Sequence, residues 1–221
     1  MIYRVKEVFV TLQGEGAQAG RVAVFCRFSK CNLWTGREAD RHRAVCQFCD
    51  TDFVGTDGQN GGEFETADAL ARHVAAFWPG SFADAEKPLV VCTGGEPLLQ
   101  LDEPMVEAFH AQGFTVAVET NGTLPAPEGI DWLCMSPKAG TTIVIEQCDE
   151  LKLIYPQDGQ HPADYDHIRA SERFIAPMAS PQVISGADTF RDANTRKAIE
   201  FCLAHPQWRL SVQMHKMVGI D

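Results

Sequence analysis

The feature that most constrains the fold is a regular alternation of short apolar runs with helical patterns along the 221 residues. Short apolar runs bounded by turn residues predict strands. We expect strands over Val5–Leu12, Val22–Phe28, Leu89–Cys92, Thr115–Glu119, Trp132–Met135, Leu151–Tyr155, Arg173–Ala176 and Trp208–Gln213. Strands that alternate with helices favour a parallel sheet. The sequence therefore predicts an α/β fold whose parallel sheet is open or closes as part of a barrel.

Three segments between the expected strands have the spacing of amphipathic helices. Thr66 is placed to cap the first, whose apolar stripe runs from Ala67 to Trp78. The second ends at Gly113, and the third begins at Asn194. The apolar residues expected to face the core in the second and third are Met105, Val106 and Phe109, then Ile199, Cys202 and Leu203. Two irregular inserts, 32–62 and 156–172, interrupt a single domain over residues 1–221.

Composition excludes several classes of protein. The 221 residues carry 19 basic and 30 acidic side chains, a formal charge of −11, which disfavours a protein that coats nucleic acid. No apolar run approaches the length of a membrane span, and the first residues are no signal peptide. We therefore expect a cytoplasmic protein without nucleic-acid or membrane partners.

Polar clusters follow the expected strands. They are Gln13–Gly16, Arg27 with Cys31, Thr93–Pro97, Glu119–Gly122, Ser136–Lys138 and Met214–Lys216. The carboxyl ends of parallel strands meet at one edge of a sheet, where ligands bind. We therefore expect these six clusters to form one site.

Three of the eight cysteines stand apart from the rest. Cys26, Cys92, Cys134, Cys148 and Cys202 have settings in which a thiol acts as a small structural hydrophobe. Cys46 and Cys49 have the two-residue spacing that lets two thiolates reach one metal, and Cys31 precedes Cys46 by a fourteen-residue loop. The spacing fits a zinc site completed by His42, or an iron–sulfur cluster with one open iron; a free redox pair fits less well.

The Cys31–Trp34 and Cys46–Thr51 strings, taken with Thr93–Pro97, resemble the radical S-adenosylmethionine (SAM) enzymes. The chain is similar, nearly end to end, to the 7-carboxy-7-deazaguanine synthases of the queuosine pathway. This resemblance rests on Leu12–Gly16, Phe25–Arg27, Cys49–Thr51, Thr93–Pro97, Glu119–Gly122, Ser136–Lys138 and Gln213–Lys216. It implies an incomplete TIM-like barrel of the radical SAM type, with a cluster-loop insert at about 32–62.

One departure concerns the cluster motif. Radical SAM enzymes usually place three residues between their first two cluster cysteines, and here Trp34-Thr35 stands where the second would be. The loop from Thr35 to Val45 must therefore bring Cys46 back to the cluster. We expect the site to be retained, because the downstream Cys-x-x-Cys-Asp-Thr string is intact.

The resemblance implies a carbon–nitrogen lyase that converts 6-carboxy-5,6,7,8-tetrahydropterin to 7-carboxy-7-deazaguanine with loss of ammonia. Cys31, Cys46 and Cys49 would hold a 4Fe–4S cluster, and SAM would supply a 5′-deoxyadenosyl radical catalytically. Arg27 would pair with the substrate carboxylate. The other substrate contacts implied are Leu12, Gln13, Gly14, Thr93 and the terminal carboxylate of Asp221, with Glu15 as a further candidate. Arg27 and Thr93 are thus the catalytic candidates.

The same resemblance implies the residues around SAM and a magnesium ion. SAM would contact Phe48, Cys49, Asp50, Gly95, Ser136, Pro137, Lys138, Gln213, Met214, His215 and Lys216. Thr51 would supply a hydroxyl to Mg²⁺, although Asp50 and Asp52 are the ligands that chemistry alone prefers. A homodimer and a one-electron donor such as flavodoxin or ferredoxin are expected from the family only.

Three alternatives stay open at this stage. Another radical SAM enzyme, such as an activase for a glycyl-radical protein, shares the cysteine and Gly-Gly-Glu features. A zinc-stabilised α/β binding module would close its site with His42. A degenerate paralogue would keep the fold without the cluster.

Overall fold

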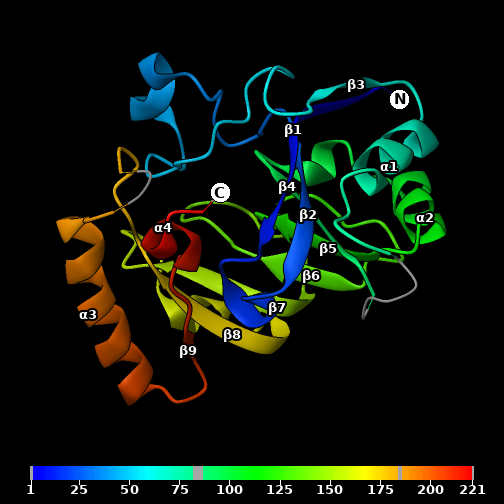
Figure 1. Cartoon of the computed structure of the whole chain (residues 1–221). Helices are drawn as coiled ribbons and strands as arrows, with labels where there is room; N and C mark the ends of the chain where they lie inside the picture. The colour runs from blue at the N-terminus through cyan, green and yellow to red at the C-terminus, as the bar shows by residue number, and fades with distance from the viewer. Residues whose placement is uncertain (1, 82–86, 184–185, 221) are drawn as a thin grey trace.

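A computed structural model describes residues 2–81, 87–183 and 186–220. In these residues the strands form one nine-stranded sheet with the order β3-β1-β2-β4-β5-β6-β7-β8-β9 (Figure 1). The strands are β1 (Tyr3–Leu12), β2 (Val22–Phe28), β3 (Gly62–Phe64), β4 (Leu89–Gly94), β5 (Thr115–Thr120), β6 (Trp132–Met135), β7 (Gln147–Tyr155), β8 (Arg169–Pro177) and β9 (Arg209–Leu210). All neighbours from β2 to β9 are parallel. The α/β class and the incomplete barrel are confirmed.

The first strand is the exception to the predicted parallel sheet. β1 runs antiparallel to both neighbours, so Leu12 lies opposite Val22 at the amino end of β2. Only nine residues join these strands, and a parallel crossover needs about a dozen or more. The expectation that Gln13–Gly16 lies at the carboxyl edge was therefore wrong.

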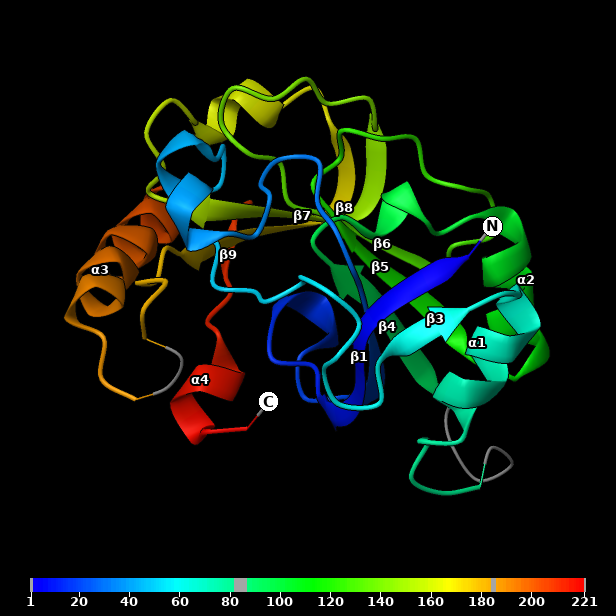
Figure 2. The same ribbon diagram turned by 90° about the horizontal axis from the view of Figure 1, so that it is seen from above.

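The three longer helices of the described residues cover the outer side of the sheet in two groups (Figures 1 and 2). α1 (Ala67–Ala75) and α2 (Glu103–Ala111) lie together beside β1 to β5, and α3 (Thr189–Ala204) lies along β8 and β9. The first group closes a core with the outward residues of β1, β2, β4 and β5. The second group closes a core around β7 and β8. On the inner side of the sheet, neither group of helices takes part in the small buried cluster of Ala23, Leu89, Val91 and Ala117.

The predicted caps are right for the first helix and wrong for the third. The Thr66 hydroxyl accepts from the Ala69 amide at 3.1 Å, as expected. α3, however, is capped by Asp188, and Asn194 is buried inside the helix, where its amide donates to the Met178 carbonyl at 2.9 Å. The predicted inward face is right only for Cys202, which packs against the core; Ile199 and Leu203 are 41% and 80% exposed.

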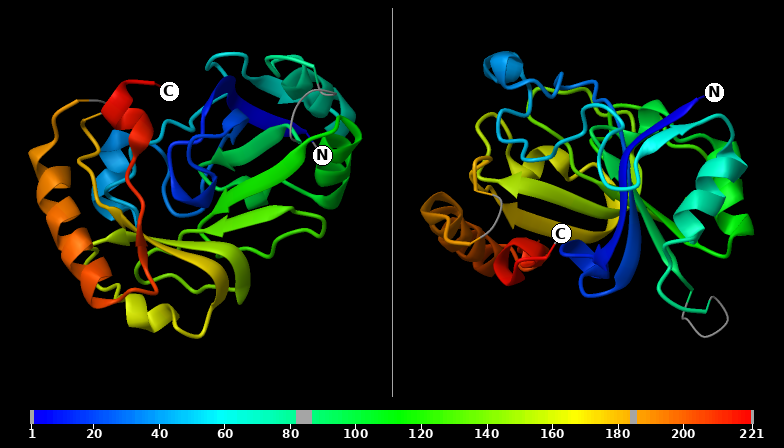
Figure 3. Two further views of the ribbon diagram at one scale, coloured as in Figure 1. Left: turned by 60° about the horizontal axis from the view of Figure 1, so that its bottom comes forward. Right: turned by 45° about the horizontal axis from the view of Figure 1, so that its top comes forward.

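The irregular inserts and the last strand also differ in detail from expectation. Residues 32–62 hold a 3₁₀ helix (Glu38–Arg43) and end where β3 starts. Residues 156–172 hold a 3₁₀ helix (Pro162–Tyr165) and the first part of β8. The predicted strand Trp208–Gln213 is reduced to the two residues of β9, and helix α4 (Met214–Val218) follows it. The chain end turns back across the open side of the sheet toward the β1–β2 hairpin (Figures 2 and 3).

Candidate active site

Two adjoining cavities lie on the inner side of the sheet. The Arg27 cavity, of about 420 Å³, is bordered by β1, β2 and the C-terminal residues. The thiol cavity, of about 200 Å³, is bordered by the cysteine loop and the ends of β4, β5 and β7. Both are lined by Glu15, Asp50, Thr51, Thr93, Glu119 and Gln213. Because the two cavities share these walls, ligands in them would lie next to each other.

Cys31, Cys46 and Cys49 all line the thiol cavity. Burial raises the pKa of each thiol, that of Cys46 to about 11, and the cation of Lys138 opposes this rise. Among the described residues, no three His, Cys, Asp or Glu side chains converge on a point that would hold one metal ion. His42 is exposed on the 3₁₀ helix Glu38–Arg43 and does not line the cavity.

The remaining five cysteines are structural, as predicted. Cys26, Cys92, Cys134 and Cys148 are buried, and Cys202 is half-buried against the core under α3. All eight cysteines are free thiols. The three thiols of the cavity are therefore available to bind a cofactor.

The two glycines of the Thr93–Pro97 string let the first cysteine approach β4. A Cβ on Gly94, at φ +140°, would lie 2.1 Å from the Phe28 carbonyl oxygen, and one on Gly95 would lie 2.2 Å from that of Lys30. Only glycine permits the segment before Cys31 to lie this close. These glycines thus place the first thiol, in addition to any contact with SAM.

Glu96 joins two motifs that lie far apart in the sequence. Its carboxylate, fully buried, accepts from the Thr120 hydroxyl at 2.7 Å and from the Asn121 and Leu98 amides at 2.8 and 3.0 Å. Burial raises the pKa of Glu96, and these hydrogen bonds counteract it. The turns after β4 and β5, which line the thiol cavity, are therefore held together.

A charge network forms part of the wall that the two cavities share. The Lys152 ammonium, on β7, is 2.8 Å from a Glu15 oxygen and 3.1 Å from a Glu119 oxygen. The Gln13 amide donates to the other Glu119 oxygen at 2.9 Å. Although β1 ends at the other edge of the sheet, the side chains of Gln13 and Glu15 thus reach the inner face. Burial raises the pKa of Glu15, but Lys152 and its other partners outweigh this and lower it to about 2.

The C-terminal segment forms part of the wall of the Arg27 cavity. The Gln213 amide donates to Glu15 at 3.0 Å, and the Met214 amide donates to the Gly14 carbonyl at 3.0 Å. Lys216 forms an ion pair with Asp50, the residue after Cys49. A Cβ on Gly14 would lie 2.3 Å from the His215 ring. These contacts bring the first and last motifs of the sequence together.

Most of the predicted site residues line the two cavities. The Arg27 cavity is lined by Leu12, Gln13, Gly14, Arg27, Asp50, Thr51, Thr93, Gln213, His215 and Lys216. The thiol cavity is lined by Phe48, Gly95, Ser136 and Lys138 in addition to the three cysteines. Two predicted residues, Pro137 and Met214, line neither cavity; the Pro137 carbonyl instead accepts from Gln160 at 2.9 Å. Asp221 lies outside the described residues.

Sequence reasoning missed Lys152 and Glu150. Both lie on β7, where alternate residues face the same side of the sheet, so Glu150 and Lys152 both face inward. The available signal was a single lysine, Lys152, between the apolar residues Leu151 and Leu153.

Two polar atoms at the site are buried without a hydrogen-bond partner in the described part of the chain. They are Oε1 of Gln213, which lines both cavities, and Nε1 of Trp34, which lines the thiol cavity. Unsatisfied buried polar atoms are uncommon and indicate a missing partner. A ligand that offers a donor to Gln213 and an acceptor to Trp34 would fit these cavities.

Comparison with known proteins agrees with this arrangement. The chain is 58% identical over 220 residues to a 7-carboxy-7-deazaguanine synthase of Bordetella pertussis and 56% identical over 220 residues to one of Burkholderia multivorans. Each match covers all of both chains. The fold matches the crystal structure of QueE from Escherichia coli with a TM-score of 0.66 and 25% identity, over 97% of this chain and 95% of that one. No protein-family model matches. On the full-length identities, the chain belongs to the 7-carboxy-7-deazaguanine synthase family.

Proposed function

We propose that the two cavities bind SAM and 6-carboxy-5,6,7,8-tetrahydropterin side by side and that the chain converts the pterin to 7-carboxy-7-deazaguanine. The observation that carries this proposal is the pair of adjoining cavities, one lined by three thiols and the other by Arg27. The shared wall supports direct contact between cofactor and substrate, which a radical reaction requires because the reacting atoms must be held close together. The family relationship supports the reaction type.

Cys31, Cys46 and Cys49 would hold the 4Fe–4S cluster. Three cysteine thiolates leave one iron of such a cluster without a protein ligand. The cluster and SAM, when bound, supply the 5′-deoxyadenosyl radical. The residues proposed to contact SAM are Phe48, Cys49, Asp50, Gly95, Ser136, Pro137, Lys138, Gln213, Met214, His215 and Lys216. The unpartnered Gln213 oxygen, which would accept a ligand N–H or O–H, supports this assignment.

Arg27 would bind the substrate carboxylate. Its Nε donates to Glu7 at 2.7 Å, and its guanidinium lies 5.6 Å from the centre of the Phe9 ring. Glu7 and Phe9 therefore orient the side chain, and a guanidinium has five N–H donors, so several remain for a carboxylate. The other substrate contacts proposed are Leu12, Gln13, Gly14, Thr93 and Asp221. Arg27 and Thr93 would be the catalytic residues.

Thr51 is the proposed Mg²⁺ ligand. Asp50 and Asp52, the ligands that chemistry alone prefers, are paired with Lys216 and Lys6, the latter at 3.0 Å. Carboxylates engaged in this way are poorer ligands, which favours the Thr51 hydroxyl together with water and substrate oxygens.

The remaining proposals concern organisation and partners. We propose one radical SAM core domain over residues 1–221, with the cluster-loop insert at about 32–62. Among the described residues, no helix is both long and apolar enough to cross a bilayer. A cytoplasmic homodimer that receives electrons from flavodoxin or ferredoxin and binds no nucleic acid completes the proposal.

Anaerobic reconstitution with iron and sulfide tests this function. The reduced protein is expected to give an EPR signal that changes when SAM is added, and then to form 7-carboxy-7-deazaguanine from the carboxypterin. A signal that is indifferent to SAM would contradict the open iron. A SAM-sensitive cluster without turnover of the carboxypterin would contradict the substrate and favour another radical SAM activity.

A further inference from the structure

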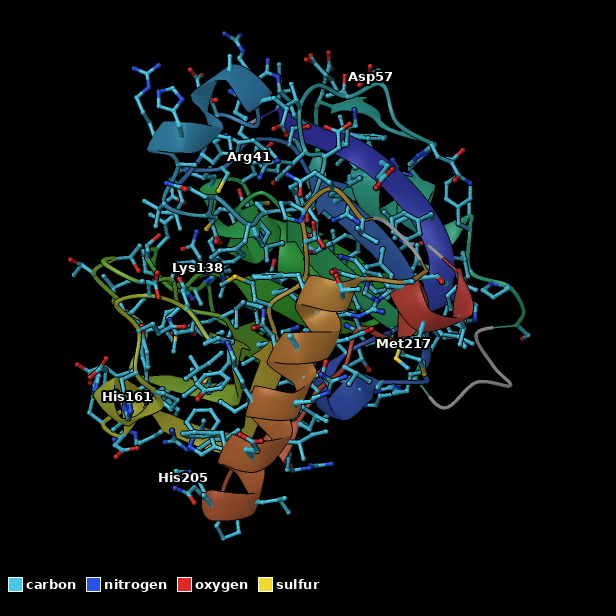
Figure 4. The ribbon with its side chains drawn as sticks, turned by 90° about the vertical axis from the view of Figure 1, so that its left-hand side faces the viewer. Arg41, Asp57, Lys138, His161, His205 and Met217 are labelled. Atoms are coloured by element: carbon cyan, nitrogen blue, oxygen red, sulfur yellow. The ribbon has the colours of Figure 1, made fainter. Side chains whose placement is uncertain are left out.

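The fourteen residues between Cys31 and Cys46 must return the chain to the cluster, and one side chain connects both ends of this loop. Arg41 lies on the 3₁₀ helix Glu38–Arg43, above Lys138 in Figure 4. One of its terminal nitrogens donates to the carbonyls of Gln47 and Cys49, both at 2.8 Å. Two carbonyls of the Cys46–Cys49 turn are thus held by a single guanidinium.

The same guanidinium contacts the other end of the loop. Its central carbon lies 4.3 Å from the centre of the Trp34 ring, three residues after Cys31. Trp34 packs edge-on against Phe53 at 5.6 Å, and Cys31 and Cys49 pack against this small apolar cluster. Glu38 holds the remaining nitrogens of Arg41 at 2.5 and 2.7 Å, so the guanidinium is oriented from both sides.

Trp34 also has an unused donor. It is buried, it lines the thiol cavity, and its Nε1–H has no partner in the described residues. A buried indole N–H normally finds an acceptor. The sulfurs of an iron–sulfur cluster accept hydrogen bonds, and such bonds favour the reduced, more negative cluster.

We propose that Arg41 and Trp34 are a positioning pair for the cluster. Arg41 closes the long loop by tying the Cys46–Cys49 turn to Trp34, and Trp34 donates its N–H to a sulfur of the cluster. This inference rests on the proposed cluster at Cys31, Cys46 and Cys49.

Four variants of the reconstituted protein test the pair. Arg41→Gln removes the positive charge. Arg41→Lys keeps the charge but lacks the planar guanidinium, whose several N–H groups reach the two carbonyls and Glu38 at the same time. Trp34→Phe keeps an aromatic ring without the N–H. Arg43→Gln is the matched control, because Arg43 lies on the same 3₁₀ helix, is 72% exposed and pairs only with Asp40 in the interactions of the described residues.

Loss of iron to a chelator is the first measurement. Charge-assisted hydrogen bonds are strong enough that Arg41→Gln should release iron about tenfold faster than wild type. Arg41→Lys should be intermediate, and Arg43→Gln should match wild type. Equal rates for Arg41→Gln and Arg43→Gln would overturn the role of Arg41. Thermal unfolding of the apo protein shows whether Arg41→Gln folds. If it does not, Arg41→Lys decides the question: iron loss from this variant at the wild-type rate would also overturn the role of Arg41.

The midpoint potential of the cluster is the second measurement. Trp34→Phe should make the midpoint potential more negative. If one hydrogen bond is lost, the equilibrium constant for one-electron reduction should fall about fivefold. An unchanged potential would refute the N–H···S contact. Failure of the wild-type protein to bind a cluster would instead contradict the proposed function, so the two failures are distinguishable.

Discussion

Replacing Lys152 by methionine tests the charge network in the wall that the two cavities share. The Lys152 side chain is 4% exposed, and its ammonium is 2.8 and 3.1 Å from the carboxylates of Glu15 and Glu119. Removing one partner of a buried ion pair costs about 3–5 kcal/mol, because the other charge stays buried and unpaired. The pKa of Glu15, about 2 against an ordinary 4.5, corresponds independently to about 3 kcal/mol. We therefore expect the variant to lose about 3–5 kcal/mol of its free energy of unfolding at neutral pH.

The pH dependence of this loss has a definite sign. In the wild type, the lowered pKa of Glu15 contributes stability that is present above pH 4.5 and is lost as the pH falls toward 2. Without Lys152, burial would raise the pKa of Glu15 above its ordinary value. The folded variant would then bind a proton more readily than the unfolded chain, so its stability would fall as the pH rises. The difference in free energy of unfolding between wild type and variant should therefore decrease as the solution becomes more acidic.

Urea unfolding of the apo protein under anaerobic conditions, at about pH 8 and about pH 5, measures both effects. Lys197→Met is the control, because Lys197 is exposed on α3. A loss below about 1 kcal/mol, the size typical of exposed ion pairs, would refute the reasoning. A loss of unfolding free energy that is the same at both pH values would also refute it.

Further changes test the walls of the Arg27 cavity. Arg27→Lys should raise the KM for the carboxypterin by about tenfold or more in steady-state kinetics, since an ammonium cannot pair bidentately with a carboxylate; an unchanged KM would contradict the assignment. Gly14→Ala should lower stability by about 1–3 kcal/mol in denaturant melts, because its Cβ would lie 2.3 Å from the His215 ring; a wild-type melt would show that α4 yields freely. Burial lowers the pKa of His215, so the free energy of unfolding of the wild type should fall as the pH drops below 6.5. In the same denaturant melts, His215→Asn should lose less stability over this pH range, because asparagine does not titrate.

Much of the site could be predicted from short strings of sequence. Ligand chemistry is a local property, because Cys46 and Cys49 need only their spacing to reach one cofactor. The periodicity of apolar residues likewise identified the parallel strands and α2, whose Met105, Val106 and Phe109 are buried as expected. The helix cap at Thr66 was read correctly for the same reason, since a cap involves only neighbouring residues.

What depends on distant partners could not be predicted in this way. Lys152 reads as a solvent-facing strand residue until Glu15 and Glu119 are placed beside it, because a buried charge is tolerated only with its counter-charges. Arg41 reads as one of several surface arginines until its contacts with Trp34 and the Cys46–Cys49 turn are known.

The sequence by itself determined the α/β class, the three candidate thiols and the order of the motifs along the chain. The short connection between β1 and β2 already favoured their antiparallel pairing. The tertiary structure alone decided that α4 follows β9 and that the first and last motifs meet at Gly14 and Met214. The physical reason is that local sequence patterns indicate only which side of a helix or strand is apolar. The charge pairs of the cavity and the closure of the chain end are set by contacts between residues far apart in the sequence.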